Sequence, residues 1–132
     1  MLPKIAVLTS GGDAPGMNAA IRAVVHQAAV REVKVVGIKH GFEGLLKHEF
    51  LDMDLGSVDD IIQHGGTILR SARSNRFRTP VGQEEAVANL QEAGIDGLVV
   101  IGGEGSYRGG AALTTRGVAV IGVPGTIDND IP

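Results

Sequence analysis

Short apolar runs alternate with segments of helical periodicity along this chain. Each run is only five or six residues long and is bounded by polar residues or glycine, as buried strands of a parallel sheet are. The segments predicted as strands are Lys4–Thr9, Lys34–Lys39, Gly97–Ile101 and Val118–Val123, with Phe50–Asp54 as a weaker candidate.

Longer amphipathic stretches fill the gaps between these runs. Apolar residues recur on one face of a helix predicted from Met17 to about Arg31. Thr79 and Pro80 form a strong helix start, with Thr as N-cap and Pro at the first helical position, and Gly94 is the stop. Further helices are predicted over Ser106–Thr115, from a capping-box-like start at Ser57 to about Gly65, and less firmly at Gly41–Gly44, whereas Thr67–Arg78 is predicted to be largely loop.

The alternation of strands and helices predicts the fold class. A strand–helix–strand rhythm is typical of α/β proteins, in which crossover helices cover both faces of a parallel sheet. The 132 residues are enough for one domain. We therefore predict a three-layer α/β domain over residues 1–132.

Composition excludes several classes of protein. Hydrophobic residues make up 43% of the chain and charged residues 20%, which is typical of a globular protein. The net charge of −3 argues against a nucleic-acid partner. Without cysteine there is neither a disulfide nor a thiolate metal site, and no apolar run approaches the roughly 18 residues of a membrane span. The amino terminus lacks a signal-peptide layout, so we expect a soluble cytoplasmic protein without membrane contact.

Glycine is unusually frequent, with 20 residues, and it gathers where predicted strands end. Three strands are followed by loops rich in Gly and in Asp, Glu, Ser or Thr, namely Thr9–Asn18, Gly102–Ser106 and Pro124–Asp130. Open parallel sheets bind ligands outside the carboxyl ends of their strands. We expect the three loops to converge on one site.

Each loop carries plausible phosphoryl-transfer chemistry, and each also fits an ordinary turn. Backbone N–H groups of Gly11 and Gly12 suit a phosphate at a helix N-terminus. Glu104, flanked by glycines, suits a Mg²⁺ ion carried by a nucleotide. Asp128 and Asp130 suit proton acceptance and orientation of a hydroxyl. Read singly, the motifs leave both interpretations open, since Gly, Asn and Asp are common turn residues.

Four arginines surround Ser74 in a chain that is otherwise net acidic. They are Arg70, Arg73, Arg76 and Arg78. The planar guanidinium donates two hydrogen bonds at once to phosphate oxygens. A solvated basic face is the competing interpretation.

Taken together, the loops resemble the signatures of one family, the bacterial ATP-dependent 6-phosphofructokinases. The segment Thr9–Arg22 resembles the opening signature of that family. Gly65–Leu69, Ser71–Arg73 and Pro124–Asp130 resemble its later signatures, in the same order and with similar spacing. The resemblance covers essentially the whole chain.

The resemblance implies a phosphofructokinase-like, Rossmann-type fold and a glycolytic transferase. Such enzymes transfer the γ-phosphoryl group of ATP to the 1-hydroxyl of fructose 6-phosphate with Mg²⁺, releasing ADP, and form homotetramers. Residues 1–132 would be the N-terminal nucleotide-binding domain, incomplete and without the second, sugar-binding domain. We expect the 132-residue chain alone to lack meaningful kinase activity.

The resemblance also assigns roles to residues. The nucleotide would be bound by Gly12, Arg73, Ser74, Gly103, Glu104, Gly105 and Ser106, with Glu104 as the metal ligand. Arg73 would bridge the transferring phosphoryl group, Asp128 would be the catalytic base and Thr126 would help to position the reacting groups. The sugar would be contacted by Thr126, Ile127, Asp128 and Asp130, and an allosteric effector by Arg22 and His26.

Two departures from the family pattern bear on function. Glu104 stands where the family has Asp, which predicts altered metal use because Mg²⁺ requires tight octahedral geometry. His26 stands where many members have Arg, so phosphate would be held there only by the protonated ring. Gly105 stands where family members that use pyrophosphate typically carry a carboxylate, so the resemblance favours ATP as the donor. The alternatives are a related NAD or lipid kinase and a non-catalytic nucleotide-binding module.

Overall fold

The computed structural model describes residues 3–11, 16–59 and 67–124. The strands are β1 (Lys4–Thr9), β2 (Lys34–Ile38), β3 (Phe50–Met53), β4 (Gly97–Gly102) and β5 (Val120–Pro124). The α-helices are α1 (Met17–Val30), α2 (Gly41–Leu46), α3 (Pro80–Glu92) and α4 (Glu104–Thr114), and two 3₁₀ turns are η1 (Leu55–Val58) and η3 (Arg76–Arg78).

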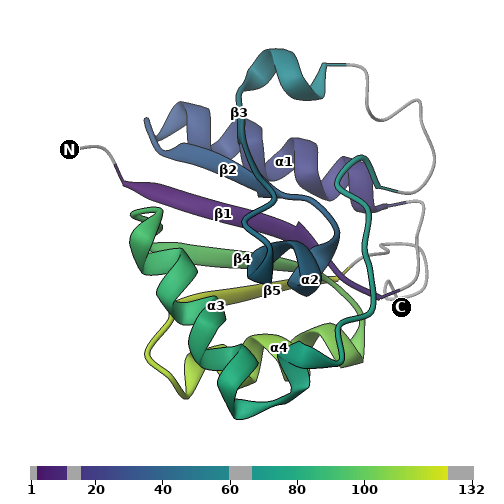
Figure 1. The fold of residues 1–132 in the computed structure, drawn as a ribbon. Helices are drawn as coiled ribbons and strands as arrows, with labels where there is room; N and C mark the ends of the chain where they lie inside the picture. Colours follow the sequence, from purple (N-terminus) through teal and green to yellow (C-terminus); the bar gives the residue numbers. More distant parts are fainter. Residues whose placement is uncertain (1–2, 12–15, 60–66, 125–132) are drawn as a thin grey trace.

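The strands form one sheet in the order β3-β2-β1-β4-β5 (Figure 1). Strands β2, β1, β4 and β5 are mutually parallel, which confirms the α/β prediction. The edge strand β3 differs, because it runs antiparallel to β2. Only residues 39–49 separate these two strands, and a parallel crossover needs roughly a dozen residues or more.

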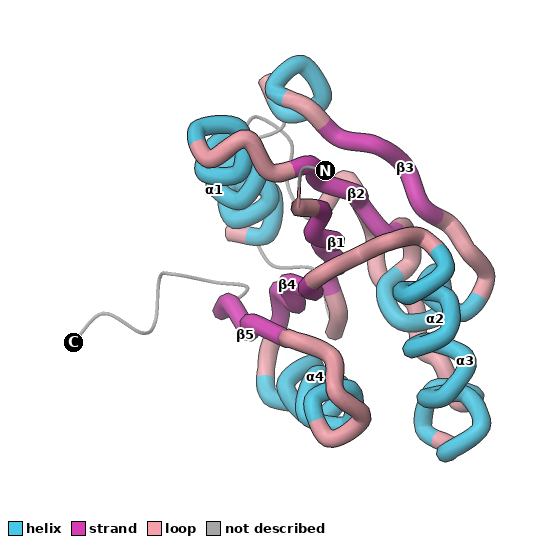
Figure 2. The backbone as a smooth tube through the Cα atoms, turned by 90° about the vertical axis from the view of Figure 1, so that its left-hand side faces the viewer, coloured by secondary structure: helices cyan, strands magenta, loops and turns pink. Residues whose placement is uncertain are grey.

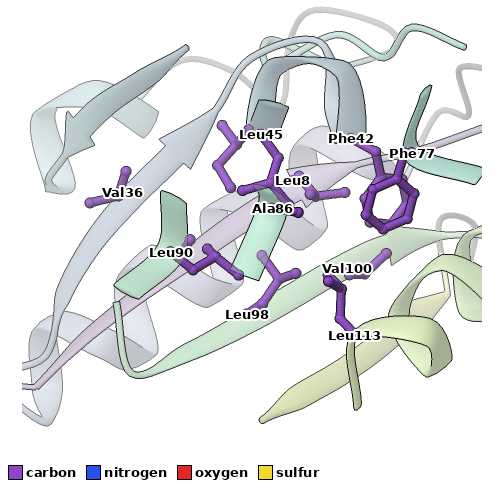
Figure 3. Packing of buried hydrophobic residues seen from close by; sticks show 12 residues of the cluster. Leu8, Val36, Phe42, Leu45, Phe77, Ala86, Leu90, Leu98, Val100 and Leu113 are labelled. Carbon is purple, nitrogen blue, oxygen red and sulfur yellow. The ribbon is translucent and has the colours of Figure 1, made fainter. Parts of the chain in front are cut away.

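Helices cover both faces of the sheet, as predicted. Figure 2 shows α1 on one side of the strands and α2 and α3 on the other. Alternate residues of β1 point to opposite faces, so Leu8 joins a core cluster with α2, α3 and α4, whereas Val7 joins a second cluster with α1. In the first cluster, Leu8, Leu98 and Val100 lie beneath the helices (Figure 3).

Local sequence signals predicted some helix ends correctly and others at the wrong residue. Thr79 caps α3 as predicted, since its Oγ1 accepts a hydrogen bond from Gly82 N at 3.0 Å, and Gly94 follows the helix at φ +73°. The helix predicted from Ser106 instead starts at Glu104, because the Gly103 carbonyl already accepts from Ser106 N at 3.1 Å. The capping box joins Asp54, just before η1, to Ser57 within η1. The helix predicted to start at Ser57 is therefore wrong in its start, and its residues Ser57 and Val58 belong to a 3₁₀ turn.

The connection from β2 to β3, which includes α2, turns so closely at Gly44 that it has no room for a methyl group there. A Cβ atom added to Gly44 in α2 would lie 1.5 Å from the Lys39 carbonyl oxygen. That oxygen belongs to the backbone next to β2, so it cannot move aside without disturbing the sheet. Gly97 provides the contrast, because its added Cβ would meet the Ala119 carbonyl oxygen at an ordinary 3.6 Å.

Gly44→Ala is therefore expected to lower the free energy of unfolding by about 1–3 kcal/mol, despite the better helix propensity of Ala. Gly97→Ala is the matched control and should change it by less than about 1 kcal/mol. Urea denaturation followed by circular dichroism measures both. Equal stability of Gly44→Ala and the wild type would show that the turn is not as close as described.

Candidate functional site

A cleft of about 1260 Å³ opens at the carboxyl ends of β1 and β4. These neighbouring strands are where the chain order reverses, since β1 leads to β2 on one side and β4 leads to β5 on the other. Ser10 and Gly11 follow β1 and line the cleft, as do Gly102 and Gly103 at the end of β4. Ligands of open α/β sheets bind at such switch points.

The loops after β1 and β4 touch at Gly102. A Cβ atom there would lie 2.4 Å from the Ser10 carbonyl oxygen and 2.2 Å from Ser106 Oγ. Ser10 N also donates to the Ile101 carbonyl oxygen at 2.9 Å. The two glycine-rich loops that the sequence predicted to converge therefore meet here. Glycine at position 102 leaves the space that this contact needs.

Ser106 presents a hydroxyl without a partner in the described part of the chain. The residue is 2% exposed and lines the cleft, and its Oγ makes no hydrogen bond there. It lies in the first turn of the eleven-residue helix α4, whose N-terminus carries a partial positive charge. A buried hydroxyl beside such a terminus is suited to a phosphate oxygen.

Arginine supplies all the formal charge among the described residues that line the cleft. Arg73, Arg78 and Arg108 line it, and none of the described lining residues is Asp or Glu. None of the three forms an ion pair with a described residue. Arg76 is different, because it pairs with Glu85. The described wall of the cleft is therefore electropositive, in a protein of net charge −3.

Ser74 lines the cleft, but its hydroxyl is engaged by the protein. Ser74 Oγ donates to Glu43 Oε1 at 2.8 Å and accepts from Phe77 N at 3.2 Å. The hydrogen bond from Ser74 to the Glu43 carboxylate is the main reason why the pKa of Glu43 lies below its usual value of 4.5, and the hydrogen bond from Lys47 is the next. The contact ties the segment that carries Arg73 to α2.

Phe42 and Phe77 form an aromatic wall of the cleft. Phe42 and Phe77 stack with ring centroids 4.2 Å apart and an interplanar angle of 12° (Figure 3). A Cβ atom on Gly109 would lie 2.6 Å from Phe42 Cζ, so α4 packs directly against the pair. The pair gives this part of the cleft an apolar lining, although Phe42 is only 7% and Phe77 only 5% exposed. No local sequence pattern indicates that these two rings stack, because 34 residues separate them along the chain.

The described structure brings together Arg73, Ser74, Gly103 and Ser106 of the predicted nucleotide site. Glu104 and Gly105 begin α4 directly beside them, but the Glu104 side chain lies outside the described structure. Gly12, Thr126, Ile127, Asp128 and Asp130 also lie outside the described residues. Arg78, one of the four arginines around Ser74, also lines the cleft, whereas Arg70 and Arg76 do not. Arg108 and Gln83 line it without having been predicted as site residues.

Arg22 and His26, the predicted effector residues, lie one turn apart on α1 and do not line this cleft. Arg22 Nε and His26 Nε2 are buried and have no hydrogen-bond partner in the described structure. Over the described ranges there is no group of three or more His, Asp or Glu side chains placed to hold a metal ion. No helix in the same ranges is long and apolar enough to cross a membrane.

Ser74→Ala is expected to raise the pKa of Glu43 toward 4.5, because the main cause of its depression is removed. A carboxyl group whose pKa is lower in the folded than in the unfolded protein stabilises the fold at pH values above the unfolded-state pKa. This stabilisation is lost as the pH falls below 4.5 and through the pKa of the folded state. At neutral pH the wild type should have the higher free energy of unfolding, and this difference from Ser74→Ala should become smaller in acid.

The test is a carbon-13 titration of the Glu43 carboxyl in both proteins, with urea denaturation at neutral and acidic pH. Lys47→Met, which removes the next cause, is the control and should give a smaller rise in the pKa. Identical Glu43 titration midpoints in wild type and Ser74→Ala would contradict the assignment.

Comparison with known proteins identifies the family of this chain. The family model described as Phosphofructokinase matches residues 4–132. The chain is 61% identical to the ATP-dependent 6-phosphofructokinase of Lysinibacillus sphaericus over 131 residues, covering 99% of this chain and 41% of that protein. It is 60% identical to the enzyme of the same name from Brevibacillus brevis over 129 residues, covering 98% and 40%.

A solved phosphofructokinase structure also matches this chain. The structure of Pichia pastoris phosphofructokinase in the T-state matches with a TM-score of 0.90 and 37% identity, over 100% of this chain and 16% of that one. The chain thus spans about two fifths of the length of the curated relatives it matches. On the family match over residues 4–132, this chain belongs to the phosphofructokinase family.

Proposed function

We propose that the chain provides the nucleotide side of an ATP-dependent 6-phosphofructokinase. The reaction transfers the γ-phosphoryl group of ATP to the 1-hydroxyl of fructose 6-phosphate, giving fructose 1,6-bisphosphate and ADP. One observation carries the proposal: an arginine-lined cleft without described carboxylates lies at the switch point of a phosphofructokinase-family sheet. The proposed substrates follow the names of the relatives.

The cleft offers the groups that phosphoryl transfer requires of a protein. This reaction depends mainly on positioning and on neutralising charge at the phosphoryl oxygens. Arg73 is proposed to bridge the transferring group, while Arg78 and Arg108 add positive charge. Ser106 Oγ and the N-terminus of α4 are proposed to bind the phosphate chain. The Phe42–Phe77 wall is proposed to face the adenine base of ATP.

Glu104 is the proposed Mg²⁺ ligand. It is the first residue of α4, between Gly103 and the buried Ser106 hydroxyl at the cleft. One carboxylate there fits Mg²⁺, which commonly takes one or two protein carboxylates together with substrate phosphates. The ion would neutralise charge on the β- and γ-phosphates.

Asp128 is proposed as the base that takes the proton of the sugar hydroxyl. Thr126 is proposed to position the reacting groups, and Ile127 and Asp130 to contact the sugar with them; these roles rest on the family resemblance. We further propose a cytoplasmic homotetramer in which residues 1–132 correspond to the nucleotide-binding domain of the longer relatives. A non-catalytic nucleotide-binding role is the second candidate, favoured by Glu in place of Asp at position 104.

Calorimetric titration of the chain with Mg·ATP tests the nucleotide site. Arg73→Met should weaken binding roughly tenfold or more, because a charged hydrogen bond is lost. Arg76→Met is the matched control, since Arg76 pairs with Glu85 outside the cleft, and should leave the affinity within about twofold. Asp128→Asn should also retain affinity, because the base acts on the sugar. Absence of Mg·ATP binding by the folded wild type would contradict the proposal.

Glu104→Asp tests the metal assignment. The shorter carboxylate should lower the Mg²⁺ concentration needed for half-maximal ATP binding, because it matches the family ligand and Mg²⁺ tolerates little misplacement. Glu104→Ala should raise that concentration, and binding of metal-free ATP serves as the control for both variants. An unchanged Mg²⁺ requirement in both variants would remove Glu104 from the metal site.

A further inference from the structure

A chain of hydroxyl groups links the end of β1 to the turn at Arg70. Thr9 is the last residue of β1 and is fully buried. Its Oγ1 lies 3.0 Å from Thr67 Oγ1 and donates to the Arg70 carbonyl oxygen at 3.0 Å. Leu69 N in turn donates to Thr67 Oγ1 at 3.1 Å. Two hydrogen bonds of Thr9 thus join β1 to the segment that leads to Arg73, and the third lies within that segment.

The direction of these bonds follows from the groups involved. The Arg70 carbonyl oxygen only accepts, so the single hydroxyl proton of Thr9 points to it. The bond between the two hydroxyls must then be donated by Thr67. Thr67 Oγ1 keeps a lone pair for Leu69 N, so the three bonds run in one direction and reinforce one another. Thr9 is the last donor of this chain.

The bond from Thr9 ends on a residue with an unfavourable backbone. Arg70 has φ +60°, in the left-handed region that residues other than glycine seldom adopt. The preceding residue is fixed, because Leu69 is 2% exposed in the core and its carbonyl oxygen accepts from His40 N at 2.8 Å. The Thr9 hydroxyl therefore helps to hold a turn that the Arg70 backbone alone disfavours.

The turn decides which residues reach the cleft. Ser71, Ala72, Arg73 and Ser74, directly after the turn, all line the cleft, and none of residues 67–70 does. Ser71 Oγ donates to the Gly11 carbonyl oxygen at 2.6 Å and docks this stretch on the loop after β1. The packing is close, because a Cβ atom on Gly41 would lie 2.9 Å from the Thr9 carbonyl oxygen and 3.7 Å from Ala72 N.

We propose that Thr9 is a positioning residue, which touches no ligand but places the Arg73 guanidinium through the Arg70 turn. The inference rests on the proposed function, in which Arg73 contacts the transferring phosphoryl group of ATP. Thr9 then governs the preference for ATP over ADP, since ADP lacks that group. It does so from outside the cleft, because Thr9 is not among the residues that line it.

A double-mutant cycle tests this role. Calorimetry gives the ratio of the ADP and Mg·ATP dissociation constants for the wild-type chain and for Thr9→Val, Arg73→Met and the double variant. Thr9→Val keeps the shape of the side chain and removes the hydroxyl. It should reduce the ATP preference roughly three- to tenfold, as expected for one lost hydrogen bond, and change it less than about twofold when Arg73→Met is present.

Two further variants separate positioning from general damage. Thr9→Ser keeps the hydroxyl and should retain the wild-type ATP preference. Arg70→Gly should restore that preference when combined with Thr9→Val, because glycine adopts the turn without strain. If Thr9→Val does not fold, Thr67→Val breaks the first hydroxyl link and should reduce the preference in the same direction.

The outcomes distinguish the two proposals. Wild-type binding of ATP that depends on Arg73, with a Thr9→Val effect that is absent or simply adds to that of Arg73→Met, would overturn the role of Thr9 alone. Wild-type protein that is folded but binds neither nucleotide would overturn the proposed function, and the nucleotide role of Thr9 with it. A non-additive cycle with rescue by Arg70→Gly is the expected result.

Discussion

The close contact of two loops at Gly102 organises this molecule. The loop after β1 and the loop after β4 approach until the Ser10 carbonyl oxygen and Ser106 Oγ occupy the space of a missing Cβ atom. Neighbouring parallel strands bring the loops to the same edge, and glycine removes the last obstacle between them. The cleft, the start of α4 and the buried Ser106 hydroxyl all follow from this contact.

A second level of organisation joins the cleft to the core. The stacked pair Phe42–Phe77 belongs to the core cluster beneath α2, α3 and α4 and also faces the cleft. Polar contacts complete the arrangement, since Ser74 is tied to Glu43 of α2 and Ser71 to the Gly11 carbonyl. The arginine-bearing segment has little regular structure of its own, so these contacts define its path.

The sequence was sufficient for the strands, for α1 and α3, and for the meeting of the loops after β1 and β4. The strand at Lys4–Thr9 and the Thr79 cap were predicted correctly because each depends on a local pattern. The reversal of β3 depends on how far the short connection after β2 can reach, and hydrophobic periodicity does not report strand direction. The Phe42–Phe77 wall joins residues distant in sequence, and the Arg70 turn requires a backbone angle that Arg does not favour. Such features emerge only from tertiary packing.

The separation of charge in this protein has a consequence for its behaviour in salt. The chain is net negative, yet the described cleft wall carries only arginine as formal charge. Added electrolyte screens both fields over a Debye length of about 8 Å at physiological ionic strength. It weakens the repulsion between molecules that favours solubility and, at the same time, the attraction of the cleft for anions. Dilute buffer therefore favours both the repulsion that keeps the molecules apart and the attraction of the described cleft wall for anions, and added salt weakens both.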